Sequence, residues 1–332
     1  MLFEILVCVL FAAYFSQRWV RTRKKMETSQ RTLIPIAVNF HFTRKCNYKC
    51  GFCFHTAKTS DMPTLTDSQL ALKKLKDGGM RKLNFAGGEP FLYPKYLGDL
   101  VRYCKQDLGL ESVSIVTNGS KVKRDWFIRY GEYLDIMAVS CDSFNEKTNV
   151  QIGRGQGLHL NAVQEVSSLC REFRVKFKVN TVVCRYNWQE DMNHDISLLQ
   201  PFRWKCFQVL IVPGENTGTD GTLRNATEFQ ISSAEFEAFI NRHAKVHGEK
   251  LVPEPNNLLR HSYLMIDEHL RFYASGNTPS VLTLLDTDLQ TLLKDAGWDE
   301  AAFIKRSGVY DWSRKPNTTP CSSKFRDQKL DW

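Results

Sequence analysis

The chain has 332 residues, 42% hydrophobic and 24% charged, so it can bury a large core as one large domain or two smaller ones. Its formal charge of +9 suits an anionic partner, whether a nucleotide triphosphate, a nucleic acid or an acidic membrane surface. Ten scattered cysteines in a chain of this length argue against a secreted disulfide framework, and we therefore expect a reducing compartment.

The first predicted element is an apolar N-terminal segment. Residues 2–15 are nearly all apolar, and a cluster of arginines and lysines follows over residues 18–25. A cleaved signal peptide carries its positive charge before the apolar stretch, and the positive-inside rule keeps the flanking charge in the cytosol. Because a full span needs about 20 apolar residues, we predict a membrane-associating helix and linker over residues 1–30 that lies on the membrane. Docking of this helix on a protein partner is the alternative.

Six strands then alternate with helices. We predict strands over 35–42, 82–86, 112–117, 136–140, 175–183 and 204–212, and helices over 67–76, 96–105, 125–133, 158–173 and 192–199. This alternation is typical of parallel βαβ units. Because it fades near Pro213, the predicted fold is α/β, a partial (βα)6 barrel over residues 31–213. Residues 214–332, with helices over 234–245 and 282–293, are expected to form a C-terminal extension that covers the active site.

The loop after the first strand carries the strongest motif. Cys46, Cys50 and Cys53 have the spacing Cys-x3-Cys-x2-Cys. Three thiolates can hold three irons of a four-iron cluster and leave the fourth iron without a protein ligand. S-adenosylmethionine (SAM) can fill that position through its amino and carboxylate groups. A zinc site with His55 as the fourth ligand, or chance, is the alternative.

A second loop, Gly87-Gly88-Glu89-Pro90, follows the second strand. The two glycines let backbone approach a ligand closely, and Glu89 or backbone carbonyls can accept hydrogen bonds from the methionyl ammonium of SAM. Taken alone this is an ordinary turn. Because this glycine loop comes one strand after the cysteine loop, the two motifs together favour a SAM site.

Basic residues alternate with apolar ones in the last two strands. Lys176 and Lys178 belong to the fifth strand, and Arg203 and Lys205 begin the sixth. Cations that point into a barrel are costly without an anion to meet them, so this pattern indicates an anionic ligand. A solvated surface charge is the alternative for each residue.

The cysteine motif resembles the radical SAM superfamily, and longer runs resemble its viperin family. The similar runs are 39–60, 84–91, 114–120, 140–144, 152–157, 203–205, 214–216 and 329–332, so the resemblance covers residue 35 to the end. Viperins are interferon-linked antiviral enzymes that convert CTP to 3′-deoxy-3′,4′-didehydro-CTP. The resemblance implies a 4Fe-4S cluster and SAM as cofactors, with a 5′-deoxyadenosyl radical that takes the C4′ hydrogen of the ribose.

The resemblance also implies roles for individual residues. Lys178, Arg203 and Lys205 would contact the phosphates, and Asn39 would help to hold the nucleotide. Ser140 matches a SAM-contacting serine, and Arg154 a ligand-side arginine that could serve SAM, substrate or both. Tyr263 would relay a proton or gate the site.

Partners and location are implied in the same way. The tail Leu330-Asp331-Trp332 resembles a docking signal for the cytosolic iron–sulfur targeting machinery. We expect the cytosolic face of the endoplasmic reticulum and lipid droplets, a membrane surface and an external reductase as partners, and no nucleic acid. Segments 274–293 and 311–326 depart from the family pattern, which leaves nucleotide choice open. The alternatives are a radical SAM enzyme for UTP or a nucleotide sugar, and a membrane-tethered antiviral interaction protein.

Overall fold

The computed structural model describes residues 32–219, 221–259, 262–273 and 280–314. The chain divides into two compact units, Met1–Leu33 and Ile34–Trp332, and the fold below is that of the second. The predicted anchor over residues 1–30 and the tail Leu330-Asp331-Trp332 lie outside the described residues. Within the described ranges, no helix has the length and apolar content that crossing a bilayer requires.

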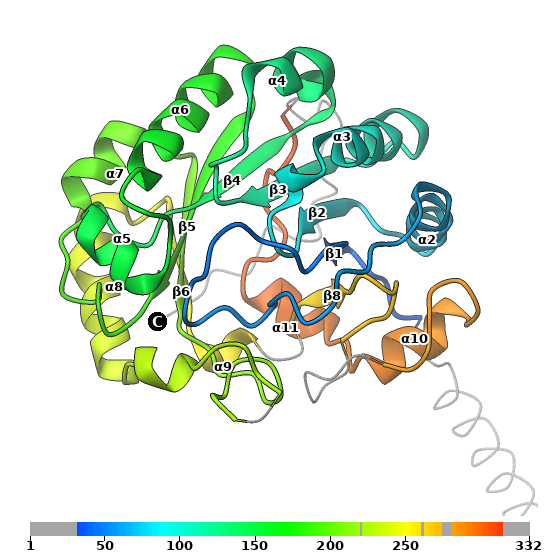
Figure 1. Ribbon diagram of the computed structural model, residues 1–332. Helices are drawn as coiled ribbons and strands as arrows, with labels where there is room; N and C mark the ends of the chain where they lie inside the picture. The colour runs from blue at the N-terminus through cyan, green and yellow to red at the C-terminus, as the bar shows by residue number, and fades with distance from the viewer. Residues whose placement is uncertain (1–31, 220, 260–261, 274–279, 315–332) are drawn as a thin grey trace, which may run out of the picture. The chain divides into compact units, whose positions relative to one another are not determined.

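The centre of the fold is one sheet of eight parallel strands in the order β7-β6-β5-β4-β3-β2-β1-β8 (Figure 1). The strands are β1 (Ala37–His41), β2 (Lys82–Ala86), β3 (Ser112–Thr117), β4 (Ile136–Ser140), β5 (Lys176–Val183), β6 (Arg203–Gln208), β7 (Leu251–Glu254) and β8 (Leu264–Ile266). Consecutive strands β1 to β7 are neighbours, as successive right-handed βαβ units require. The predicted parallel α/β half-barrel is therefore confirmed.

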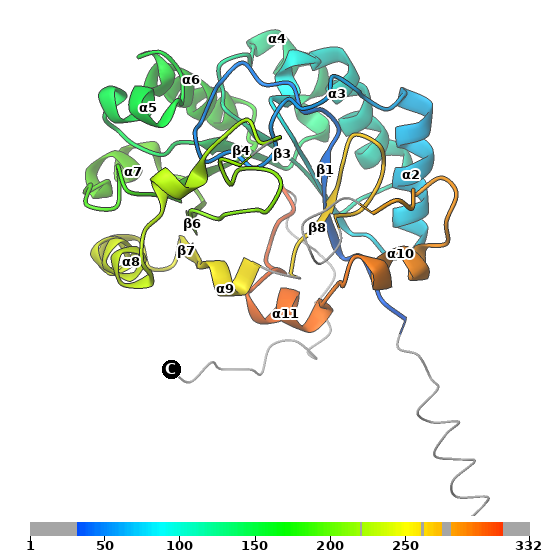
Figure 2. The ribbon, with the colours of Figure 1, turned by 60° about the horizontal axis from the view of Figure 1, so that its bottom comes forward.

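Most of the helices lie along the outer side of the curved sheet in both ribbon views (Figures 1 and 2). The helices are α2 (Leu65–Asp77), α3 (Pro94–Arg102), α4 (Arg124–Tyr130), α5 (Glu146–Ile152), α6 (His159–Glu172), α7 (Asn193–Leu199), α8 (Ser233–His247), α9 (Asn256–Leu259), α10 (Leu289–Asp295) and α11 (Glu300–Lys305). Local sequence defines their ends. Thr64 caps α2 by accepting from the Asp67 amide, and Ser232 and Glu235 form a capping box at α8.

Three expectations for the chain after residue 140 need correction. Strands β7 and β8 come from the region predicted to be loops and helices only, and they extend both edges of the sheet. Short strands of four and three residues carry too little alternation to be recognised in a sequence. The helix predicted over 282–293 begins at Leu289, because Asp288 accepts from the Thr291 amide and caps it there. Helices α5, α9 and α11 were not predicted.

The strands divide their side chains by alternation. In β5 the positions Phe177, Val179, Thr181 and Val183 are buried, whereas the residues between them are half-buried. On the helix-covered side the packing is aromatic: Trp204 is fully buried, lies against Phe239 of α8 and donates to the Thr181 hydroxyl at 2.9 Å. The opposite face is polar. Asn84 donates to Asn39 Oδ1 at 2.8 Å, a bond that bridges β2 and β1.

Candidate active site

A cavity of about 430 Å³ lies along this polar face of the sheet. It is lined by most of the residues singled out in the sequence: Asn39, Cys46, Cys50, Cys53, Gly87, Gly88, Ser140, Arg154, Lys178, Lys205 and Tyr263. Glu89 and Arg203 do not line it. The roles given to these residues stay predictions, but the fold brings them to one place from β1, β2, β4, β5, β6 and the loops between.

The cysteine loop is held in shape by backbone contacts with the end of α5. Lys49 and Gly51 donate their amides to Gly153 and Ile152 carbonyls at 3.0 and 2.9 Å. Gly153 has φ +87°, and a Cβ there would lie 2.4 Å from the Lys49 carbonyl oxygen, so only glycine fits. The unpredicted helix α5 therefore serves the loop directly.

The three thiols fit a cluster better than a single metal ion. Burial raises the pKa of Cys46, Cys50 and Cys53 to about 11, so the thiols are protonated until a cation binds them. Within the described part of the chain, no three His, Cys, Asp or Glu side chains converge closely enough to hold one metal ion. His55 Nδ1 lies 3.0 Å from the Tyr273 hydroxyl, and Nε2 is buried without a hydrogen-bond partner among the described groups. A four-iron cluster spreads its ligands over separate irons, so the arrangement favours the cluster over zinc.

The second glycine loop packs directly on the cysteine loop. A Cβ at Gly87 would lie 2.5 Å from the Thr43 carbonyl oxygen, and one at Gly88 only 1.9 Å from that of Lys45. Gly88 and Glu89 donate their amides to those same carbonyls at 2.7 and 2.8 Å. The two glycines therefore let the backbones of the two loops come close to each other. Both glycines also line the cavity.

Glu89 ties its loop to the end of β3. Its carboxylate is fully buried and accepts from the Thr117 hydroxyl at 2.7 Å, the Asn118 amide at 2.7 Å and the Phe91 amide at 3.0 Å. The role of Glu89 in SAM binding stays a prediction. The sequence could not show the bonds to β3, because two of the donors lie 28 and 29 residues away.

Arg154 faces the cavity with a buried partner. Asp142, a residue that the sequence did not single out, accepts from Arg154 Nε and from the Val182 amide. The adjacent Ser140 carbonyl lies 2.8 Å from His159 Nε2. The loop after β4 therefore presents a fixed guanidinium to the cavity.

At the other end of the cavity, cations gather. Lys82, Lys178, Lys205 and Arg306 all line it. Burial lowers the pKa of Lys82 to about 7 and that of Lys205 to about 8, and it lowers the pKa of Lys178 well below its ordinary value. Ammonium groups held under such a penalty favour an anionic ligand. Lys82 was missed, although it stands two positions before Asn84 on the same face of β2, and Arg306 gave no signal in the sequence.

Glu254 connects two of these cations to Tyr263. Its Oε1 accepts from Lys205 Nζ, from the Tyr263 hydroxyl at 3.1 Å and from Arg306 Nη1 at 3.3 Å. Lys205 Nζ also lies 3.0 Å from the Tyr263 hydroxyl, and the Arg306 guanidinium stacks 3.8 Å from the centre of the Tyr263 ring. The phenol is thus fixed beside two cations.

Two of the predicted inward cations lie outside this group. Arg203 stacks 4.0 Å from the centre of the Tyr310 ring and donates to the Ser307 carbonyl at 3.5 Å. Lys176 pairs with Asp311 at 3.0 Å. Both positions are at the amino ends of their strands, where the chain from Ser307 to Asp311 crosses. Gly308 and Tyr310 of that segment line the cavity, and Arg203 Nε is buried without a hydrogen-bond partner among the described groups, so the phosphate role of Arg203 stays a prediction.

Comparisons with known proteins agree with the site. The model of the Radical SAM superfamily matches residues 40–198. The S-adenosylmethionine-dependent nucleotide dehydratase RSAD2 of Danio rerio is 47% identical over 94% of this chain and 85% of its own length. The S-adenosylmethionine-dependent nucleotide dehydratase of Flammeovirga pacifica is 33% identical over 86% and 98%. Among solved structures, Streptococcus suis SuiB bound to S-adenosylmethionine is similar in fold, with a TM-score of 0.60 at 15% identity over 83% of this chain and 67% of SuiB.

Proposed function

The chain belongs to the radical SAM superfamily and to its nucleotide dehydratase family, the viperins, and from this premise we propose that it converts CTP to 3′-deoxy-3′,4′-didehydro-CTP. It is an enzyme, and its cofactors are a 4Fe-4S cluster and SAM. The observation that carries the proposal is the cationic end of the cavity, across the polar face of the sheet from the cysteine loop.

The cluster and SAM have a defined place in this scheme. Cys46, Cys50 and Cys53 would hold three irons, and Arg154 with the backbone of Gly87 and Gly88 lines the adjoining space. Cluster and SAM held there would supply the radical chemistry that the proposal needs to take the hydrogen from C4′ of the ribose.

The chain's own residues bind and orient the nucleotide. Lys82, Lys178 and Lys205 meet the triphosphate, and each phosphate contact returns a buried ammonium to its charged form. Asn39 is fixed by bonds to Asn84 and to the Leu264 carbonyl, and it presents the centre of the cavity with an amide suited to the nucleoside.

Tyr263 is the residue we assign to proton transfer. Loss of the 3′-hydroxyl as water consumes one proton and one electron to leave the 3′,4′ double bond. The phenol lies between Lys205 Nζ and Glu254 Oε1, so it can pass a proton toward the departing hydroxyl and recover one from the ammonium. The further electron must come from a separate reductase.

The test uses anaerobically reconstituted full chain with SAM and one nucleotide at a time. We expect 5′-deoxyadenosine to form fastest with CTP, and the product mass to equal CTP minus one water. Faster formation with UTP or a nucleotide sugar would overturn the choice of CTP and leave the enzyme class intact.

An antiviral role at the cytosolic face of the endoplasmic reticulum and lipid droplets is also proposed. The apolar and basic segment over residues 1–30 supports membrane association, and the tail Leu330-Asp331-Trp332 supports docking of the iron–sulfur targeting machinery. Substitution of Cys46, Cys50 and Cys53 by Ala distinguishes an antiviral role that needs catalysis from one that needs only binding to other proteins. Antiviral activity that survives the loss of all three thiols would favour the interaction protein.

A further inference from the structure

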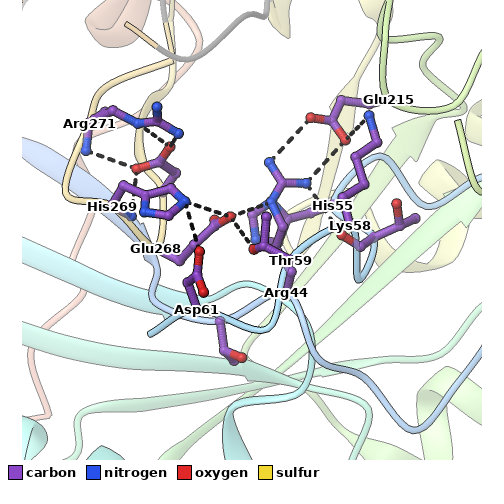
Figure 3. Close-up of polar contacts among 12 residues, drawn as sticks. Arg44, His55, Lys58, Thr59, Asp61, Glu215, Glu268, His269 and Arg271 are labelled. Carbon is purple, nitrogen blue, oxygen red and sulfur yellow. Dashed lines mark hydrogen bonds and ion pairs between the residues drawn. The ribbon is translucent and has the colours of Figure 1, made fainter. Parts of the chain in front are cut away.

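Arg44, two residues before the first cluster cysteine, lies at the centre of a buried ion network (Figure 3). Its Nε donates to Glu268 Oε1 at 2.7 Å, and its two terminal nitrogens donate to the two oxygens of Glu215, both at 3.2 Å. One terminal nitrogen also donates to the Tyr273 hydroxyl at 2.8 Å, and the other to the Thr56 carbonyl at 3.3 Å. All five N–H groups of the guanidinium are therefore used.

The partners of Arg44 come from distant parts of the chain. Thr56 ends the cysteine loop that Arg44 begins, so one side chain spans the base of the loop. Glu215 follows β6, whereas Glu268 and Tyr273 follow β8. Two separate segments of the C-terminal region are thus joined to the cysteine loop through one guanidinium.

The network is balanced in charge but is a poor source of stability. Lys58 Nζ lies 3.4 Å from Glu215, so two cations face two carboxylates, and the side chains of Arg44, Glu215 and Glu268 are only 5%, 6% and 1% exposed. Desolvation of buried charges offsets most of their attraction. Well-packed apolar residues in the same place commonly give a protein equal stability. What such a network does provide is one fixed geometry, because every member loses its partners if the loop moves.

The same C-terminal segments hold the backbone of the loop beside two cluster cysteines. Arg224 Nε donates to the Cys50 carbonyl at 3.2 Å, and Asn216 Nδ2 donates to the Phe52 carbonyl at 2.8 Å. The Tyr273 hydroxyl, which accepts from Arg44, lies 3.0 Å from His55 Nδ1. The His55 carbonyl in turn lies 3.6 Å from Cys53 Sγ.

We infer that Arg44 is a positioning residue for the cluster, which locks the three thiols in the arrangement that binds iron by joining the cysteine loop to Glu215, Glu268 and Tyr273. The C-terminal region is then part of the cluster site as well as a cover for the nucleotide. This inference concerns retention of the cluster and holds whichever nucleotide the enzyme uses.

The test compares Arg44→Lys with wild type, both reconstituted anaerobically as full chains. Lysine keeps the positive charge, but a single ammonium cannot reach both carboxylates, the phenol and the carbonyl together. We expect iron to be lost to a chelator about 10- to 100-fold faster, the range found when groups that orient metal ligands are removed. The electron paramagnetic resonance signal of the reduced cluster should also broaden, since the thiols no longer have one arrangement.

A matched control is Arg81→Lys, which makes the same replacement at another arginine bound by a carboxylate. Arg81 contacts Glu111 at 2.6 and 2.7 Å, just before β2 and β3 begin, whereas the cysteine loop follows the end of β1. The rate of iron loss should be unchanged in Arg81→Lys. The inference is overturned if Arg44→Lys loses iron at the wild-type rate, or if Arg81→Lys loses it as fast as Arg44→Lys.

A milder variant keeps the test decisive should Arg44→Lys fail to fold. Tyr273→Phe removes only the hydroxyl that joins Arg44 to His55. We expect faster iron loss with little change in the melting temperature of the apoprotein. A wild-type rate of iron loss in this variant would equally refute the role of the network.

Discussion

Nucleotide binding should be coupled to proton uptake, because the lysines that line the cavity are partly neutral before a nucleotide binds. Burial lowers the pKa of Lys82 to about 7 and that of Lys205 to about 8. A bound triphosphate favours the charged ammonium and raises both values again. Since the neutral lysines must be recharged, each bound nucleotide takes up protons, and more of them at higher pH.

The magnitude follows from these two values. At pH 8 a lysine with a pKa of about 7 is about 90% neutral, and one with a pKa of about 8 is about half neutral, so the uptake is about 1.4 protons per nucleotide. Lys178, whose pKa is also lowered, adds to this. By linkage, Lys82 and Lys205 alone lower the affinity for CTP about tenfold from pH 7 to pH 8, and Lys178 makes the fall steeper.

Isothermal titration calorimetry measures this uptake directly. CTP is titrated into the anaerobic protein at pH 8 in buffers of different ionisation enthalpy, and the slope of the observed enthalpy gives the protons exchanged. Lys82→Met should lower the uptake by about 0.9, the share of that lysine. Lys95→Met, on the exposed surface of α3, should leave it unchanged. Absence of uptake at pH 8, or the same uptake in Lys82→Met, would refute the coupling.

Three further outcomes are expected. Gly153→Ala should cost roughly 1–3 kcal/mol of unfolding free energy and lower the iron content, since its Cβ meets the Lys49 carbonyl at a positive φ; thermal melts and iron assays check this. Glu254→Gln should raise proton uptake with CTP at pH 8 by up to about 0.5, because the carboxylate keeps Lys205 charged; the same calorimetry applies. Tyr263→Phe should lower kcat about 100-fold with CTP affinity unchanged, and steady-state kinetics would contradict the proton role if KM rises instead.

The order of the half-barrel could be predicted because its signals are local. Alternation in β5 and capping at α2 and α8 act over a few residues, so they are visible in the sequence. Strands β7 and β8 could not be predicted, since they are strands only through their partners at the sheet edges.

Within the site, the sequence by itself predicted the class of chemistry. Cys46, Cys50 and Cys53 stand on one short loop with a spacing typical of cluster ligands, so no other part of the chain is needed to recognise the motif.

Only the tertiary structure decided which partners the charged groups meet. Arg203 stacks on Tyr310 and Glu89 binds the end of β3, contacts that no local pattern in the sequence indicates. Lys82 and Arg306, far apart in sequence, meet in the cavity. The physical reason is that a charge acts through the groups within a few ångströms of it, and the fold alone sets those neighbours.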